Sequence, residues 1–311
     1  MPAISASAPG KIILFGEHAV VYGQPAIAVP VHQVQARAIV RAQPGAQGIK
    51  VLAPDISLSS SLANLPLEDA VARAIHLTME ALGIKNSPAC TLMISSTIPL
   101  AAGMGSGAAV TVAIVRALSG FLGHPLPDQI VNQIAFEVEK LHHGTPSGID
   151  NTVVTYAKPV YFVKDQTMES IEINTPFTLI IGDTGIATPT SQTVGDVRKS
   201  YEAEPALFQN YFETCGTIAK NAAYSIQHSR ITSLGPLMND NHDILVKMGV
   251  SCPELDRLVD AARAAGSWGA KLSGGGRGGN MIALIDPDRA KVVETALKDA
   301  GAVRTINTTV R

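Results

Sequence analysis

The pattern of apolar and polar positions predicts strands at the start of the chain. Residues 11–41 hold four short β-rich runs, KIILF, HAVVYG, PAIAVPV and VQARAIVRA. Turn residues separate or follow these runs, at Gly16, at Gly23 to Pro25 and at Pro44 with Gly45. This alternation is typical of a strand meander. The stretch 53–64, APDISLSSSLAN, lacks any such period and is predicted to be a long, functional loop.

Helical spacing appears further along the chain. Residues 68–82 and 128–143 carry apolar residues at helical intervals, and each stretch is followed by glycine. Between them, CTLMISSTIPL is predicted to be a strand that leads through a glycine-rich turn into a helix over residues 108–118. Arg116 and the preceding glycines leave that apolar stretch too short to span a membrane, so a buried helix is expected.

The second half of the chain mixes buried strands with long helices. FTLIIGD, MIALID and VRTINTTV are predicted to be strands, and residues 201–227 and 253–265 are predicted to be helical. Because both halves mix the two kinds of element, the fold class is predicted to be α+β. The boundary is placed after residue 174, which gives one domain over 1–174 and a second over 175–311.

Composition narrows the class of protein. The 311 residues are 46% hydrophobic and 16% charged, with 24 Lys and Arg against 26 Asp and Glu and a net charge of −2. Disorder is excluded, and a nucleic-acid partner is not expected without a basic excess or many aromatic residues. The three widely spaced cysteines offer no CxxC site and fit a reducing compartment. MPAISASAPGK lacks the order of a cleavable signal, so we expect a cytoplasmic protein with no membrane partner.

The most informative segment is IPLAAGMGSGAA, residues 98–109. Glycines let the main chain come close to a phosphate, and the N–H groups at a helix N-terminus favour an anion. A tight strand-to-helix turn that needs positive φ would explain the same glycines. No GxxxxGK[ST] occurs, so the segment is not a Walker loop. A dinucleotide site is disfavoured because no acid follows until Asp128.

Two other segments carry candidate chemistry. Lys11 opens a predicted strand and Glu17 with His18 lies at the next turn, so the three side chains could face one cleft, although a lone lysine there is usually solvated. The stretch 143–151, HGTPSGIDN, is predicted to be a loop that follows a helix. Such a loop would fix the Asp150 carboxylate as a base or a metal ligand, but turn chemistry alone explains an acid here equally well.

Helix 128–143 carries a further acid whose role the residues alone leave open. Periodicity places Glu139 away from the apolar stripe, as a solvated surface acid. Glu139 and His142 spell ExxH, but a di-metal helix bundle needs a second copy, which the sequence lacks. No GxSxG of a hydrolase is present either.

Three segments taken together are more specific than any one of them. In order and spacing, APGKIILFGEHAVVYGQPAIA (8–28), PLAAGMGSGAA (99–109) and KLSGGGRGG (271–279) resemble the three motifs of the GHMP kinases. The resemblance runs essentially the whole length of the chain. The first motif, with EKLHHGTPSGIDN (139–151) and DTGIATPT (183–190), is similar to the members that phosphorylate mevalonate.

This resemblance implies a fold and a reaction. The fold would be the two-domain GHMP kinase fold, with a ferredoxin-like C-terminal domain and the active site in the cleft between the domains. The reaction would transfer phosphate from ATP, with Mg²⁺, to the primary C5 hydroxyl of mevalonate, giving 5-phosphomevalonate and ADP. The alternatives are a related acceptor, such as phosphomevalonate or another hydroxy acid, and a non-catalytic binding protein of the same fold. A homodimer is also expected from the family.

The resemblance also implies roles for single residues. Asp150 would be the catalytic base with Lys11 close to it, and Glu139 rather than Glu137 would hold Mg²⁺ together with Ser106. The residues expected to hold the ATP phosphates are Gly103, Met104, Gly105, Ser106, Gly107 and Ala108. The residues expected to shape the substrate pocket are Glu17, His18, Thr190 and Gly276.

The sequence departs from the family pattern at two positions. The second serine of the usual GLGSSA is Gly107 here, so Ser106 or a water must replace its contact with metal or phosphate. Arg277 stands where relatives usually have glycine. Its guanidinium could bind the phosphates or the carboxylate of the substrate.

Overall fold

The computed structural model describes residues 3–99, 102–143, 147–164, 166 and 169–311, and the chain divides into two compact units. The first unit comprises Met1–Gly10, Val34–Pro99 and Gly105–Ala157. The second comprises Lys11–Gln33, Leu100–Met104 and Lys158–Arg311. Both units mix strands and helices, which confirms the α+β class. The contiguous domains 1–174 and 175–311 stay a prediction, since each compact unit draws on several stretches of chain.

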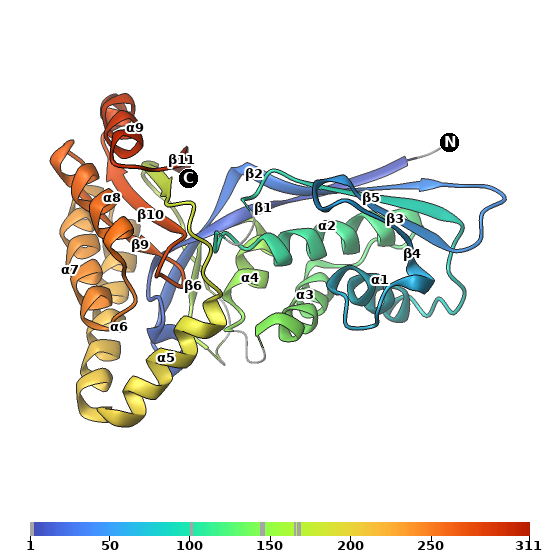
Figure 1. Cartoon of the computed structure of the whole chain (residues 1–311), viewed down its shortest axis with the longest axis horizontal. Coiled ribbons are helices and arrows are strands. Elements are labelled where there is room, and N and C mark those ends of the chain that lie inside the picture. Colours follow the sequence, from blue (N-terminus) through green and yellow to red (C-terminus); the bar gives the residue numbers. More distant parts are fainter. Residues whose placement is uncertain (1–2, 100–101, 144–146, 165, 167–168) are drawn as a thin grey trace. The chain divides into compact units, whose positions relative to one another are not determined.

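In the first unit, helices cover one face of a sheet (Figure 1). The strands are β3 (Ile49–Ala53), β4 (Leu58–Ser61), β5 (Cys90–Ser96) and part of β2 (Ala26–Ala42), in the order β4-β3-β5-β2. The helices are α1 (Ala70–Ala81), α2 (Ser106–Phe121), α3 (Asp128–His143) and α4 (Ile149–Tyr156). Alternate residues of β3 and β5 are buried, and their inner side chains form one core with α1 and α2.

The ends of these helices follow from local chemistry. The side chain of Asp69 accepts hydrogen bonds from the N–H groups of Val71 and Ala72, both at 2.9 Å, so α1 begins one residue after this cap. Helix α3 begins at Asp128, directly behind Pro127, as the sequence predicts. Helix α2 is buried along most of its length, which confirms the buried helix expected there.

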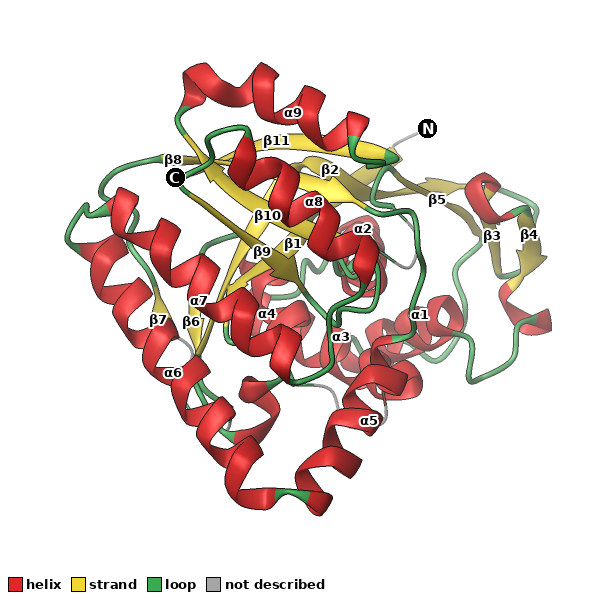
Figure 2. Cartoon of the chain, turned by 60° about the vertical axis from the view of Figure 1, so that its left-hand side comes forward, coloured by secondary structure: helices red, strands yellow, loops and turns green. Residues whose placement is uncertain are grey.

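The second unit contains a four-stranded antiparallel sheet. Its strands are β8 (Phe177–Asp183), β9 (Gly269–Ser273), β10 (Asn280–Ile285) and β11 (Arg304–Val310), in the order β11-β8-β10-β9. Helices α8 (Pro253–Ala264) and α9 (Ala290–Asp299) pack on this sheet (Figure 2). With helices between β8 and β9 and again between β10 and β11, this strand order is the ferredoxin-like arrangement, as expected.

Further elements complete the two units. Strand β1 (Ala3–Phe15) pairs with β2, and both strands contribute residues to each unit. The second unit also holds the strands β6 (Val160–Phe162) and β7 (Glu169–Ser170) and the helices α5 (Thr190–Ala203), α6 (Pro205–Gln227) and α7 (Leu234–Lys247). The short 3₁₀ helices are η1 (Ala19–Tyr22), η2 (Pro54–Ile56), η3 (Leu62–Asn64), η4 (Ile231–Ser233) and η5 (Pro287–Arg289).

Several local predictions were wrong. The runs PAIAVPV and VQARAIVRA form one continuous strand, β2, because no turn residue separates them. The run HAVVYG forms η1 instead of a strand, since Val20 N–H bonds to the Gly16 carbonyl and Gly23 ends the turn in the left-handed region. The stretch 53–64 is not a loop, because η2, β4 and η3 occupy most of it and β4 pairs with β3.

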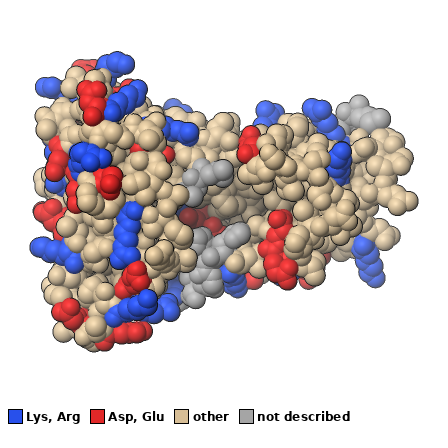
Figure 3. All heavy atoms as spheres, viewed as in Figure 1, with Lys and Arg blue, Asp and Glu red and all other residues tan. Residues whose placement is uncertain are grey.

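Two surface properties bear on possible partners. Within the described ranges, no helix has the length and apolar character that a membrane crossing requires. On the face drawn in Figure 3, lysine and arginine are interspersed with aspartate and glutamate over the helices of the second unit. That face therefore offers no continuous basic track for a phosphate backbone.

Helix α7 and strand β9 approach so closely that neither can carry a side chain at the contact. A Cβ added at Gly269 would lie 2.1 Å from the carbonyl oxygen of Gly235. A Cβ added at Gly235 would lie 2.2 Å from the carbonyl oxygen of Trp268. Since both obstacles are backbone atoms, they cannot move aside as a flexible side chain would. Glycine is thus a steric requirement at this contact.

We expect Gly269→Ala to lower the free energy of unfolding by about 1–3 kcal/mol, because α7 must separate from β9 to admit the methyl group. Gly195→Ala is the matched control. Gly195 lies in α5 with open space around its α-carbon, so alanine should stabilise the helix by up to about 1 kcal/mol. Urea unfolding of both variants measures the difference, and equal effects would contradict the close contact.

Candidate active site

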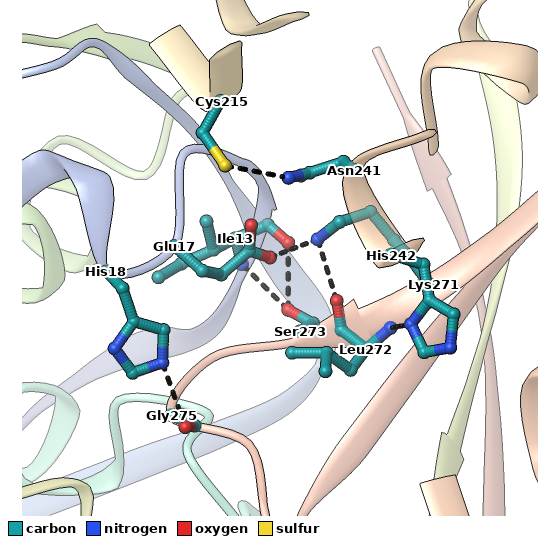
Figure 4. A network of polar contacts seen from close by, with 10 residues as sticks. All are labelled: Ile13, Glu17, His18, Cys215, Asn241, His242, Lys271, Leu272, Ser273 and Gly275. Carbon is teal, nitrogen blue, oxygen red and sulfur yellow. Dashed lines mark hydrogen bonds and ion pairs between the residues drawn. The ribbon is translucent and has the colours of Figure 1, made fainter. Parts of the chain in front are cut away.

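The second unit gathers the first and third motifs around a buried ion pair (Figure 4). The carboxylate of Glu17, at the turn after β1, pairs with the ammonium of Lys271 on β9, and both side chains are 0% exposed. Lys271 also donates to the carbonyl of Leu272 at 2.7 Å. Burial raises the pKa of Glu17 and lowers the pKa of Lys271, while their mutual attraction opposes both shifts.

Two buried groups near this pair, Cys215 and His242, are neutral near pH 7. Burial raises the pKa of the Cys215 thiol to about 12 and lowers the pKa of His242 to about 4. Asn241 donates to the sulfur of Cys215 at 3.4 Å, and the Leu272 N–H donates to Nδ1 of His242 at 3.3 Å. Glu17 and Lys271 are each other's main electrostatic partner, and the charge of Lys11 also acts to lower the pKa of Glu17.

Ser273 joins strand β1 to strand β9. Its hydroxyl accepts the N–H of Ile13 at 3.1 Å and donates to the carbonyl of the same residue at 2.8 Å. Lys271 and Ser273 are two residues apart on β9, so both side chains point to the same face of the strand, toward β1 (Figure 4). The ion pair and these two hydrogen bonds therefore fix the first motif to β9 of the third motif.

His18 is held as a neutral acceptor. Its Nε2 lies 3.0 Å from the carbonyl oxygen of Gly275, and its backbone takes a positive φ of 60°. Burial lowers the pKa of His18 to about 4, so the ring is neutral near pH 7. Because a carbonyl can only accept, Nε2 must carry the hydrogen. Nδ1 is then left as an acceptor that can accept a hydrogen bond from a hydroxyl group.

The third motif forms a six-residue loop, 274–279, between β9 and β10. A Cβ at Gly276 would lie 1.9 Å from the carbonyl of Val250, and its φ of +77° is in the left-handed region, so only glycine fits there. Thr190, the first residue of α5, packs on Gly275, where a Cβ would lie 3.0 Å from its hydroxyl oxygen. A role for Thr190 or Gly276 in binding the substrate stays a prediction.

Arg277 binds within its own chain. Its Nη1 pairs with Asp196 of α5 at 2.6 Å, and its Nε donates to the carbonyl of Gly249 at 3.1 Å. Its backbone N–H donates to Val250, with φ at 56°. The guanidinium thus fastens the loop to α5 and to the turn after α7. Its position is explained without a contact to the phosphates or to the carboxylate of the substrate.

Residues 102–104 of the second motif also belong to the second unit. The carbonyl of Met104 accepts the backbone N–H of Lys11 at 3.0 Å, and the carbonyl of Ala102 accepts the side-chain N–H of Asn280. Lys11 lies inside β1 with only 3% of its surface exposed, so the expectation of a solvated lysine at a strand start was wrong. Gly103 has φ of +72° and open space around its α-carbon.

The rest of the second motif begins helix α2 in the first unit. Gly105 is the N-cap, with φ of 69°, and it has no side chain that could cap the helix. Ser106, Gly107 and Ala108 form the first turn, whose N–H groups have no acceptor within the helix. A Cβ at Gly107 would meet nothing within 4 Å. An uncapped helix start with open space beside it suits a phosphate group.

The structure separates two neighbouring acids of α3. Glu137 is at the surface and pairs with Lys140 at 2.6 Å, whereas Glu139 is buried, with 8% of its surface exposed. The periodicity argument that made Glu139 a surface acid was therefore wrong. Helix α3 contacts α1, α2 and α4, so a wider arc of it is covered than a single apolar stripe indicates.

Asp150 lies on a helix and not on the predicted loop. It is the second residue of α4, half-buried, behind the N-cap Gly148. The next residue, Asn151, donates to the side chain of Asn132 at 2.6 Å and fastens α4 to α3. A carboxylate in the first turn is stabilised by the helix dipole. Residues 144–146 of the predicted loop lie outside the described part of the chain.

These residues offer a donor set that fits Mg²⁺ bound together with a nucleotide. The described residues hold no cluster of three or more His, Cys, Asp or Glu. Mg²⁺ at such sites takes one or two carboxylates and completes its shell with phosphate oxygens and waters. Glu139, a buried carboxylate, and Ser106, a hydroxyl at a helix start, are groups of these kinds, and their binding of Mg²⁺ stays a prediction.

The candidate site residues thus fall into two groups. The second unit brings together Lys11, Glu17, His18, Gly103, Met104, Thr190 and Gly276, and the first unit holds Gly105, Ser106, Gly107, Ala108, Glu139 and Asp150. Sequence reasoning assigned no role to Lys271 or Asn280. Lys271 carried a signal, since a charged residue inside a buried strand needs a partner. The sequence gives no such signal at Asn280, because an amide residue after a run of glycines is typical of a turn.

Comparisons with known proteins show which family the chain resembles. A model described as the GHMP kinases N terminal domain matches residues 69–158, and one described as GHMP kinases C terminal matches residues 222–303. Mevalonate kinase from Pyrococcus horikoshii is 38% identical over 96% of this chain and 93% of its own length. The enzyme from Pyrococcus furiosus is 36% identical over 96% of this chain and 93% of its own length.

Solved structures show the same relationship. The Leishmania major mevalonate kinase in complex with R-mevalonate superposes with a TM-score of 0.87 at 32% identity, covering 99% of this chain and 95% of that one. The Methanococcus jannaschii mevalonate kinase gives a TM-score of 0.86 at 27% identity, with coverages of 99% and 98%. On its sequence and its fold, the chain belongs to the mevalonate kinases of the GHMP kinase family.

Proposed function

We propose that this chain transfers the γ-phosphate of ATP to the primary C5 hydroxyl of mevalonate, which gives 5-phosphomevalonate and ADP. The observation that carries the proposal is the match to mevalonate kinases over nearly the whole of both chains, including one solved with R-mevalonate. Phosphoryl transfer needs positioned charges more than covalent chemistry. The two groups of residues described above supply charges of the required kinds.

The phosphates of ATP are bound by backbone N–H groups of Gly103, Met104, Gly105, Ser106, Gly107 and Ala108. The glycines keep the main chain accessible, and the dipole of α2 favours an anion at its first turn. Glu139 and Ser106 hold Mg²⁺. When bound, the metal neutralises the charge that develops on the phosphoryl group. Because Gly107 has no hydroxyl, Ser106 is the serine of the motif that is left for this contact.

Asp150 accepts the proton of the attacking hydroxyl. A general base needs a fixed carboxylate, and the anchoring of α4 through Asn151 and Asn132 provides one. Lys11 supplies positive charge that stabilises the transferring group. Its burial within β1 makes that charge effective, since charges act more strongly away from water.

The acceptor is bound by the loops of the second unit. His18 presents its neutral Nδ1 to a substrate hydroxyl, because its Nε2 is engaged by Gly275. Glu17 acts through Lys271, by fixing the turn that carries His18. Gly276 and Thr190 shape the adjacent wall. The cytoplasmic location and the homodimer expected from the sequence stay predictions.

The test of the reaction is ADP release from the purified chain with Mg²⁺ and ATP, measured with mevalonate, phosphomevalonate, homoserine and galactose as separate acceptors. We expect turnover with mevalonate and at most background rates with the other three. Phosphorus NMR of the product should show a phosphomonoester on C5. Turnover with phosphomevalonate alone would shift the assignment to the related acceptor. ATP binding without turnover on any acceptor would favour the non-catalytic alternative.

Asp150→Asn should lower kcat by about 10²- to 10⁴-fold, since the amide cannot accept the hydroxyl proton. ADP affinity, measured by calorimetry, should change little. Asp128→Asn is the matched control, because Asp128 is also an acid in the first turn of its helix, but it pairs with Arg116 at the surface. Wild-type turnover by Asp150→Asn would remove Asp150 from the role of base.

Glu139→Gln should raise the Mg²⁺ concentration that gives half-maximal activity by on the order of tenfold or more, because a neutral amide is a weaker ligand for a hard cation. Glu137→Gln, two residues away on the same helix, should stay within about twofold of wild type, since its charge pairs with Lys140 at the surface. Mg²⁺ titrations at saturating ATP measure both. Equal responses of the two variants would refute the assignment of Glu139.

A further inference from the structure

Asn280 is a buried polar residue that the reaction does not require directly. It begins β10 directly after the glycine loop, between its strand partners Asp183 and Ser273, and only 2% of its surface is exposed. The five residues that follow it on β10 are all apolar and fully buried. A side chain that has to be desolvated in such a place costs free energy unless its polar atoms are bonded.

Only one half of the Asn280 amide is satisfied. Its Nδ2 donates to the carbonyl of Ala102, whereas its Oδ1 is buried and has no hydrogen-bond partner among the described residues. Turning the amide over would place Oδ1 against the Ala102 carbonyl, where two acceptors repel, so the donor must face Ala102. An apolar residue would avoid the cost of the unpaired oxygen. Compared with an apolar residue, the asparagine adds the hydrogen bond to the Ala102 carbonyl.

That contact fixes the direction of a backbone N–H in the second motif. The Ala102 carbonyl and the Gly103 N–H belong to one planar trans peptide, so they point in opposite directions. Once Asn280 holds the carbonyl, the Gly103 N–H points away from β10. The same holds one step further along, where the Lys11 N–H holds the Met104 carbonyl and so directs the N–H of Gly105.

The support behind Asn280 is rigid. Gly279 donates its N–H to the carbonyl of Ile186 at 2.8 Å and accepts both the N–H and the hydroxyl of Thr184, each at 2.9 Å. The hydroxyl of Thr188 donates to the carbonyl of Arg277 at 2.7 Å. In addition, β10 lies inside the sheet, between β8 and β9 (Figure 2). A donor on such a base can hold a loop in a single orientation.

We propose that Asn280 is a positioning residue for the nucleotide phosphates, which acts by holding the Ala102 carbonyl and thereby aiming the Gly103 N–H at the β- and γ-phosphates of ATP. This inference rests on the proposed function only for the nucleotide and is independent of the acceptor. The glycines of the second motif and Asn280 then have separate roles. The glycines permit the approach of the phosphate, and Asn280 selects the orientation of the peptide that meets it.

The test compares the binding of ADP and AMP by calorimetry, with Mg²⁺ present, in the wild-type chain and its variants. Asn280→Ala should weaken ADP about tenfold, which is about 1.4 kcal/mol. AMP, which lacks the β-phosphate, should stay within about twofold. Asn280→Asp keeps the shape but replaces the donor by an acceptor, so at pH 8 it should weaken ADP at least as much. It also serves as the second probe if the alanine variant does not fold.

Asn241→Ala is the matched control. Asn241 is likewise a fully buried asparagine of the second unit, with one side-chain N–H bonded and Oδ1 without a partner among the described residues, but it contacts Cys215 and not the second motif. Its ratio of ADP to AMP affinity should equal that of wild type.

Three results with the variants would overturn the proposal. They are ADP affinity within twofold of wild type in both Asn280 variants, parallel weakening of ADP and AMP, and the same change of ratio in Asn241→Ala. Failure of the wild-type chain to bind ADP would overturn this proposal and the proposed function together. ADP binding without turnover of mevalonate would overturn only the proposed acceptor, and the comparison of variants would still decide the role of Asn280.

Discussion

The buried ion pair between Glu17 and Lys271 is the contact on which the rest of the second unit depends. Both side chains are removed from water. Burial raises the pKa of Glu17 and lowers the pKa of Lys271, and each shift favours the neutral form of the group. Such a pair adds little net stability, but the loss of one partner leaves an unpaired buried charge, at a cost of about 3–5 kcal/mol. The pair therefore acts as a specific constraint. The two charges are paired only when the turn after β1 contacts β9.

Several features of the site follow from that constraint. With the turn fixed, His18 reaches the carbonyl of Gly275, and the bond sets which ring nitrogen remains an acceptor. Ser273, on the same face of β9 as Lys271, fastens Ile13 at both of its backbone groups. The loop 274–279 then lies against residues 102–104, where a Cβ at Gly279 would be 3.3 Å from the carbonyl of Ala102. One buried contact thus organises three segments far apart in the sequence.

The candidate residues of the two units differ in kind. The second unit supplies loops whose shape is fixed by backbone hydrogen bonds and glycines, together with the buried ammonium of Lys11. The first unit supplies the start of α2 and two carboxylates, Glu139 and Asp150, each on a helix that is packed against its neighbours. Groups placed on packed helices and strands hold their positions better than groups on free loops. This suits a reaction that depends on positioned charge.

The sequence by itself determined the class of fold, most strands and helices, and the identity of the motifs. Strong local signals, such as the proline before α3 and the continuous apolar run of β8, act within a few residues and can be read without the fold. Only the tertiary structure decided that Glu139 is buried and that Asp150 lies in the first turn of a helix. It also decided that Lys271 pairs with Glu17 and that Asn280 bonds to Ala102. Burial and partnership depend on what packs against a residue from distant parts of the chain, and no local pattern carries that information.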